Sequence, residues 1–185
     1  MELLIPLWLP ILLSAVAVWI AATVAWTALP HHKQDFIGLP GEDGFMDYIR
    51  RSGIQPGNYL FPDFRGREAM KSEKTCKALE EGPVGHLSVW HTPVTMGSKM
   101  VATLVLYLVV STLIAYLTRV AIPGAAPFPR VFQVAATAGI LAYCFSFIPN
   151  ALWFGSYKRT IVATFVDGLV YGAITGAIFA WRWPH

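Results

Sequence analysis

Charged side chains are scarce in this chain of 185 residues, where lysine, arginine, aspartate and glutamate together make up 14%. A soluble domain typically carries about 25%, and the mean hydropathy here is +0.51. The few charges are clustered, so four long stretches hold almost none, and each approaches the ~20 residues that cross a bilayer. The composition indicates a multi-pass membrane protein. We predict four transmembrane helices, over Leu4–Leu29, Met100–Thr118, Phe132–Trp153 and Thr160–Trp181.

Cysteine is nearly absent as well, and its two copies form no motif. Cys76 and Cys144 have neither the spacing of a metal knuckle nor the context of a disulfide. The sequence also lacks the H-E-x-x-H and C-x-x-C motifs, a phosphate-binding loop and a serine nucleophile arrangement. The net charge of +3 is too small to argue for nucleic acid. We therefore expect no enzymatic activity, no cofactor and no nucleic-acid partner.

The segment between the first two helices is too patterned to be a linker. We expect an all-α membrane protein with a small α+β domain inserted here, so that residues 1–30 form the first helix, 31–98 the cap and 99–185 the other three helices. Amphipathic spacing, strand-like alternation and turn residues predict the elements of this cap. They are helices over Glu42–Arg51, ended by Gly53, and Arg67–Glu81, and strands over Tyr59–Phe61 and Gly85–His91.

Basic residues are distributed unevenly between the two sides of the predicted bundle. The segment from Lys33 to Lys99 and the turn with Lys158 and Arg159 hold most of them. The opposite side has only Arg119, Arg130 and Arg182. The positive-inside rule then predicts a cytoplasmic cap and both termini outside.

Small residues recur every four positions on two of the predicted helices. Asp167 is followed by Gly168, Gly172 and Gly176, and the first helix carries Ala17, Ala21 and Ala25. Such faces let helix backbones approach closely. Two interpretations stay open for the glycines, which either pack within one chain, with Gly139 on the third helix as a further small residue, or form the seam of a homo-oligomer.

Asp167 lies inside the hydrophobic stretch, where an unpaired charge would cost about 2.5–3.5 kcal/mol or more. It therefore needs a polar partner. The candidates are His32, Lys99, Asn150 and Tyr143, which the topology brings to a similar depth. A structural polar clamp, an ion or proton pathway, and a protonated aspartate facing a partner subunit are the three interpretations.

Histidines offer a further hypothesis, because imidazole binds zinc, copper and iron. His31, His32, His86 and His91 all belong to the segment 31–98, and Asp35 or Met96 is a possible companion. Their spacing gives little support, because the first two are adjacent and the other two point to opposite faces of a predicted strand.

Three short strings, Leu29–Lys33, Tyr59–Pro62 and Glu81–Gly85, resemble features of a family of small bacterial inner-membrane proteins with four helices. The resemblance implies an inner-membrane location and transfers no activity and no site residues. Our first hypothesis is a non-enzymatic structural, oligomer-forming or accessory subunit, whose partners are the lipid bilayer and a second copy or another membrane protein. The alternatives are a small oligomeric ion or proton channel or transporter that uses Asp167, and a membrane metalloprotein that uses the loop histidines.

Overall fold

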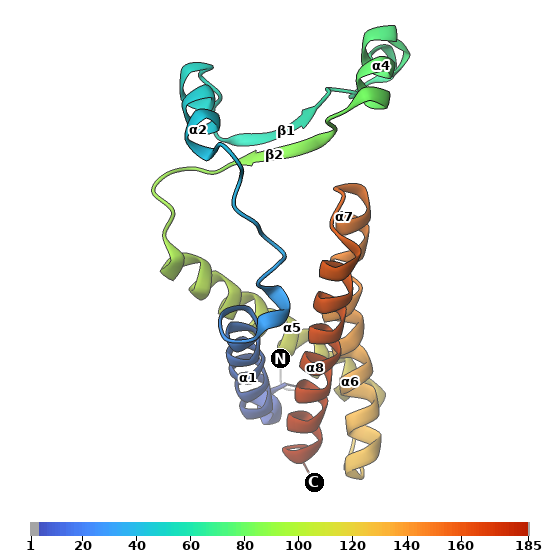
Figure 1. Cartoon of the computed structure of the whole chain (residues 1–185). Coiled ribbons are helices and arrows are strands. Elements are labelled where there is room, and N and C mark those ends of the chain that lie inside the picture. Colours follow the sequence, from blue (N-terminus) through green and yellow to red (C-terminus); the bar gives the residue numbers. More distant parts are fainter. Residues whose placement is uncertain (1–3, 185) are drawn as a thin grey trace. The chain divides into compact units, whose positions relative to one another are not determined.

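The computed structural model describes residues 4–184 and divides the chain into two compact units. One unit comprises Met1–Phe36 and Met96–His185, and the other comprises Ile37–Thr95. The chain is mostly helical, with four helices long and apolar enough to cross a membrane and a small two-stranded sheet (Figure 1).

The first unit contains all four membrane-length segments. A 3-10 turn, Ile5–Leu7, leads into α1 (Trp8–Thr27), and α5 (Met96–Ala121) and α8 (Lys158–Trp181) are continuous helices. Between them lie α6 (Phe128–Cys144) and α7 (Ile148–Trp153). Helix α5 begins at Met96, four residues before the predicted start at Met100. The prediction stops at Lys99, but one lysine at a helix end does not interrupt helical hydrogen bonding.

The third predicted helix is broken, as the proline within it requires. Helix α6 ends at Cys144 and α7 restarts at Ile148, which places Pro149 in the first turn of the new helix. A proline there removes an N–H that has no partner inside the helix anyway. The same argument explains why Pro129 is tolerated in the first turn of α6.

Helices α6 and α8 pack side by side over most of their length (Figure 1). A Cβ atom added at Gly172 would lie 2.9 Å from the backbone nitrogen of Ile140, and one at Gly176 would lie 2.6 Å from the Cβ of Ala136. A Cβ at Gly139 would lie 2.9 Å from the Cα of Gly172. The glycines of α8 therefore face α6 of the same chain at a distance that no larger residue permits.

Helix α1 packs against α5 and α8. The hydroxyls of Ser14 and Ser111, both buried, hydrogen-bond to each other across the α1–α5 contact, and Ser111 also donates to the carbonyl of Ile11 at 3.0 Å. The apolar core lies toward the end of the bundle where α1 begins and α8 ends, and there Ile114, Val131 and Phe179 are buried together. Trp183 closes this end by donating its indole N–H to the carbonyl of Gly124 at 3.1 Å.

The second unit is built around a β-hairpin. Strand β1 (Gly57–Phe61) pairs antiparallel with β2 (Gly85–Val89), with Tyr59 opposite Leu87. Helix α2 (Glu42–Arg51) precedes the hairpin, and Gly53 follows it at φ 65°, a left-handed conformation typical of helix ends. Between the strands lie α3 (Arg67–Lys71) and α4 (Glu73–Glu81).

Two predictions for this unit need correction. The single helix predicted over Arg67–Glu81 is two helices, because Ser72 is extended, with ψ 125°, and starts a new helix. Serine favours helix starts over helix interiors, which is the local reason for the break. The second strand ends at Val89, so His91 lies beyond it rather than on its face.

Candidate functional site

A short 3-10 helix, Pro30–His32, carries two adjacent histidines whose side chains both contact α8. Leu29, just after α1, is extended, and Pro30 is the first residue of the 3-10 helix. Side chains of consecutive residues in a 3-10 helix are about 120° apart, so His31 and His32 diverge less than on a strand and both reach α8. Adjacency in the sequence therefore does not prevent His31 and His32 from contacting the same residue of α8.

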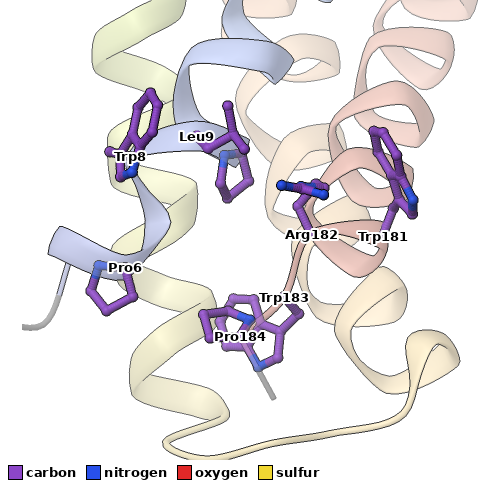
Figure 2. A pocket seen from close by; sticks show the side chains of 8 residues that line it. Pro6, Trp8, Leu9, Trp181, Arg182, Trp183 and Pro184 are labelled. Atoms are coloured by element: carbon purple, nitrogen blue, oxygen red, sulfur yellow. The ribbon is translucent and has the colours of Figure 1, made fainter.

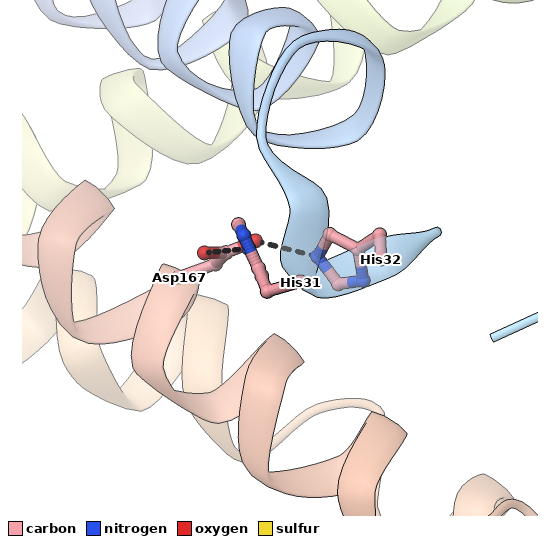
Figure 3. A group of neighbouring side chains, drawn as sticks. All are labelled: His31, His32 and Asp167. Carbon is pink, nitrogen blue, oxygen red and sulfur yellow. Dashed lines mark hydrogen bonds and ion pairs between the residues drawn. The ribbon is translucent and has the colours of Figure 1, made fainter. Parts of the chain in front are cut away.

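Both histidines contact the carboxylate of Asp167 (Figure 3). The Nε2 atom of His31 lies 3.0 Å from Oδ1, and the Nε2 atom of His32 lies 2.8 Å from Oδ2. The side chain of His32 is 2% exposed and that of Asp167 is 12% exposed, whereas that of His31 is 32% exposed. The cluster is thus buried on one side and opens toward the His31 ring.

The ring of His32 lies between two carboxylates. Its Nδ1 atom is 2.6 Å from Oδ2 of Asp35, opposite the contact with Asp167. A carboxylate oxygen only accepts hydrogen bonds, so both contacts are satisfied when both ring nitrogens carry hydrogen. The indole of Trp26 stacks on the same ring at a centroid distance of 4.0 Å and holds its plane.

The pKa values of this pair shift in opposite directions. Burial lowers the pKa of His32, but its hydrogen bonds to Asp35 and Asp167 and their charges outweigh burial, so the net shift is upward from 6.5. Burial raises the pKa of Asp35, but hydrogen bonds from His32 and Thr160 outweigh it, so the net shift is downward from 3.8. The pair therefore stabilises the fold most between about pH 3.8 and 6.5; the Asp35 part is lost as pH falls through its lowered pKa, and the His32 part as pH rises through its raised pKa.

A second layer of contacts ties the chain after His32 to the start of α8. The hydroxyl of Thr160 donates to Oδ1 of Asp35 at 3.0 Å. The guanidinium of Arg159 donates to Oε1 of Gln34 at 2.7 Å and to the backbone carbonyl of His31 at 3.1 Å. The last residues before Ile37 are thereby held to α8.

Tyrosines extend the polar region into the bundle. The hydroxyl of Tyr171 lies 3.5 Å from Oδ2 of Asp167. The ring of Tyr143 meets those of Tyr171 and Tyr107 edge-on, each at a centroid distance of 6.0 Å. Tyr143 therefore contacts Tyr171, which in turn contacts Asp167. Among the described contacts, Tyr143 makes no hydrogen bond to Asp167.

The predicted partners of Asp167 separate into two groups. His32 contacts it, and so does His31, which is not among the predicted partners of Asp167. Lys99 lies on the exposed surface of α5, and Asn150 is exposed on α7. His86 and His91 belong to the other unit. Trp26, Arg159 and Thr160 were missed, and no pattern in the sequence links them to the histidines, because they come together only in three dimensions.

The far end of the bundle carries a separate hollow of about 600 Å³ with an aromatic rim (Figure 2). The guanidinium of Arg182 lies 5.2 Å from the ring centroid of Trp181. Tryptophan and arginine together are typical of the level where a helix meets lipid headgroups. Its lining residues are Pro6, Trp8, Leu9, Pro10, Trp181, Arg182, Trp183 and Pro184.

Comparison with known protein families, curated proteins and solved structures finds no match to this chain. The resemblance to small bacterial inner-membrane proteins therefore stays a prediction.

Proposed function

We propose that this protein is a non-enzymatic, oligomer-forming subunit of a bacterial inner membrane, in which the helical bundle anchors the chain and the unit Ile37–Thr95 joins two copies on the cytoplasmic side. The observation that carries the proposal is an apolar groove in this unit. It has a volume of about 590 Å³ and is lined by Leu39, Phe45, Tyr48, Ile54, Tyr59, Phe61, His86 and Leu87.

The groove exists because the unit has almost no interior of its own. None of the residues Ile37–Thr95 is fully buried, and Tyr48, Phe61 and Leu39 are 62%, 43% and 49% exposed. Burial of apolar surface contributes about 25 cal/mol per Å². A continuous apolar surface rimmed by charges is typical of a protein–protein contact.

The charges beside the groove favour a second copy of the chain as its occupant. Helix α2 begins with Glu42 and Asp43 and ends with Arg50 and Arg51. Two such helices placed antiparallel across a two-fold axis bring the acidic start of one copy to the basic end of the other. The same segment is therefore complementary to itself.

The membrane-length segments support an anchoring role. The glycines of α8 are occupied by α6, and Asp167 is bonded to His31 and His32. Helix α5, in contrast, is mostly exposed, and its buried residues are Ser111, Ile114, Ala115 and Thr118. Its outward side chains suit lipid, and they include Val101, Val105, Leu106, Val109, Leu113 and Leu117.

Native mass spectrometry of the full chain in nanodiscs tests the proposal. The wild type should be a dimer. The double variants Arg50→Glu/Arg51→Glu and Glu42→Lys/Asp43→Lys should each dimerise at least ~10-fold more weakly, because like charges then face each other. Mixed together, these two variants should form a heterodimer.

The matched control is Lys74→Glu/Lys77→Glu, which makes the same charge change on α4 and should leave the dimer intact. A monomeric wild type, or variants that all dimerise equally, would refute the proposed contact.

A further inference from the structure

We infer that His31, His32 and Asp167 bind one divalent transition-metal ion of the zinc class at the end of α1. This site goes beyond the proposed oligomer-forming role and does not depend on it. The candidate ligand atoms are Nε2 of His31, Nε2 of His32 and a carboxylate oxygen of Asp167, and all lie within 4.8 Å of one another.

The distances are already near those of a metal site. Zinc binds histidine nitrogen and carboxylate oxygen at about 2.0–2.2 Å, which places tetrahedral ligand atoms about 3.4 Å apart. The two nitrogen–oxygen distances are 3.0 and 2.8 Å. An ion at the centre therefore needs the ligands to open by about half an ångström, and the 32% exposed ring of His31 lies where such movement is easiest.

The hydrogen-bond pattern leaves a place for a cation. Both Nε2 atoms face the Asp167 carboxylate, which accepts and cannot donate (Figure 3). A divalent ion replaces the two hydrogens at these contacts and neutralises the same carboxylate. The guanidinium of Arg159 does not take this place, because it is bonded to Gln34 and to the backbone of His31.

The surroundings of His32 are those of a supported metal ligand. Histidines that bind metals usually donate their other ring N–H to a carboxylate, which fixes the ring orientation and raises its basicity. Here Nδ1 of His32 faces Asp35, which in turn accepts a hydrogen bond from Thr160. The stacked indole of Trp26 holds the ring in the same plane.

The ligand types select the metal. Two imidazole nitrogens and one carboxylate oxygen suit zinc and its neighbours, whereas Mg²⁺ and Ca²⁺ prefer all-oxygen sites. Three protein ligands leave a fourth position for water, and the exposed side of His31 provides it. The ion would bridge the 3-10 helix after α1 to α8. Without the ion, the hydrogen bonds from His31 and His32 to Asp167 link these two elements.

The test uses the full chain in nanodiscs, stripped with a chelator and titrated with Co²⁺ and then Zn²⁺. The wild type should bind ~1 equivalent of Co²⁺ with the strong ligand-field absorption of a tetrahedral site, and Zn²⁺ should displace it. An excess of Mg²⁺ or Ca²⁺ should not.

Variants identify the ligands. His31→Ala and Asp167→Asn should lose the tetrahedral spectrum, and Asp35→Asn should keep it with ~10–100-fold weaker affinity. His91→Ala, which changes a histidine of the other unit, should behave as the wild type.

If His31→Ala does not fold, His31→Gln serves in its place, because a glutamine keeps much of the bulk. A wild type that gives no tetrahedral Co²⁺ spectrum, or ligand variants that bind as it does, would overturn the site. Neither result depends on the oligomeric state, so it is separate from the dimer test.

Discussion

His32 shows how a polar group is kept at the edge of an apolar bundle. An unpaired aspartate within a transmembrane helix would cost about 2.5–3.5 kcal/mol or more. Asp167 is instead contacted by two imidazoles, and the second carboxylate, Asp35, balances the charge on His32. The four side chains alternate between basic and acidic along the chain of contacts from His31 through Asp167 and His32 to Asp35, and they join α8 to the 3-10 helix Pro30–His32 rather than to α6.

Replacement of Asp167 separates the need for charge from the need for hydrogen bonds. In chelator-treated protein, Asp167→Asn should lower the free energy of unfolding by about 1.5–3 kcal/mol, the range for a hydrogen bond to a charged group. The amide can still accept from one histidine and donate to the other when that histidine is neutral at Nε2. Asp167→Leu should cost about 3–5 kcal/mol, because it leaves His32 buried beside Asp35 without its second partner.

Thermal unfolding in detergent, followed by tryptophan fluorescence, measures both values. A leucine variant as stable as the asparagine variant would show that the hydrogen bonds to this position do not matter.

An exposed ion pair gives a prediction about pH. Two hydrogen bonds from the Arg65 side chain, helped by one from its backbone N–H, lower the pKa of Asp63 to about 2. The folded state therefore favours ionised Asp63, a contribution present above pH 3.8 and lost as the pH falls through about 2. In Arg65→Gln the pKa should return toward 3.8.

Carboxyl NMR of the full chain labelled at aspartate measures this value, and Asp63→Asn assigns the signal. Lys77→Gln, which removes a charge elsewhere in the same unit, should leave the titration unchanged. Equal midpoints in the wild type and Arg65→Gln would contradict the role of Arg65.

At the scale of the helices, α6 and α8 form the closest contact in the bundle. A Cβ atom added at Gly168 would lie 2.7 Å from the sulfur of Cys144. Cβ atoms added at Gly172 and Gly176 would lie similarly close to Ile140 and Ala136. Close backbone approach increases van der Waals contact, which drives helix association in lipid where the hydrophobic effect does not.

Gly172→Leu should therefore separate the two helices. Overpacking costs about 1–3 kcal/mol or more, and here the obstacle is backbone, which cannot rotate away. Thermal stability in nanodiscs should fall clearly. Gly97→Leu is the matched control, because a Cβ at Gly97 meets nothing within 4 Å. If both variants unfold at the wild-type temperature, the contact at Gly172 does not stabilise the fold.

The elements that could be predicted are those specified by neighbouring residues. Hydropathy located the four membrane-length segments, Pro149 located the break in the third, and amphipathic spacing located Glu42–Arg51 with its glycine stop. The site could be predicted only in part. Asp167 required a partner, and His32 was one candidate, but the contact of His31 across 136 residues depends on how α1 and α8 pack.

The whole molecule consists of two units of different character. The membrane-length helices hold the buried core, whereas none of the residues Ile37–Thr95 is fully buried. The contacts of Asp35, Gln34 and His31 with α8 hold the chain just before it enters the second unit. The side of the membrane on which this unit lies follows from the distribution of basic residues, and it is a prediction.

The native cysteines provide a direct test of this sidedness. Cys76 is exposed in the second unit, and Cys144 is buried in α6. A membrane-impermeant maleimide should therefore leave the wild type unlabelled in intact bacterial cells and should label Cys76 after permeabilisation, because the positive-inside rule puts this unit in the cytoplasm.

The opposite side is tested with Gly124→Cys in a Cys76→Ser background. Gly124 lies between α5 and α6, and a Cβ there meets nothing within 4 Å, so the substitution should not disturb the fold. This variant should be labelled in intact cells, because the prediction puts the α5–α6 connection outside. Cys76→Ser alone should stay unlabelled before and after permeabilisation, since Cys144 is buried. Labelling of Cys76 in intact cells together with protection of Gly124→Cys would reverse the topology and would place the Ile37–Thr95 unit outside the cell.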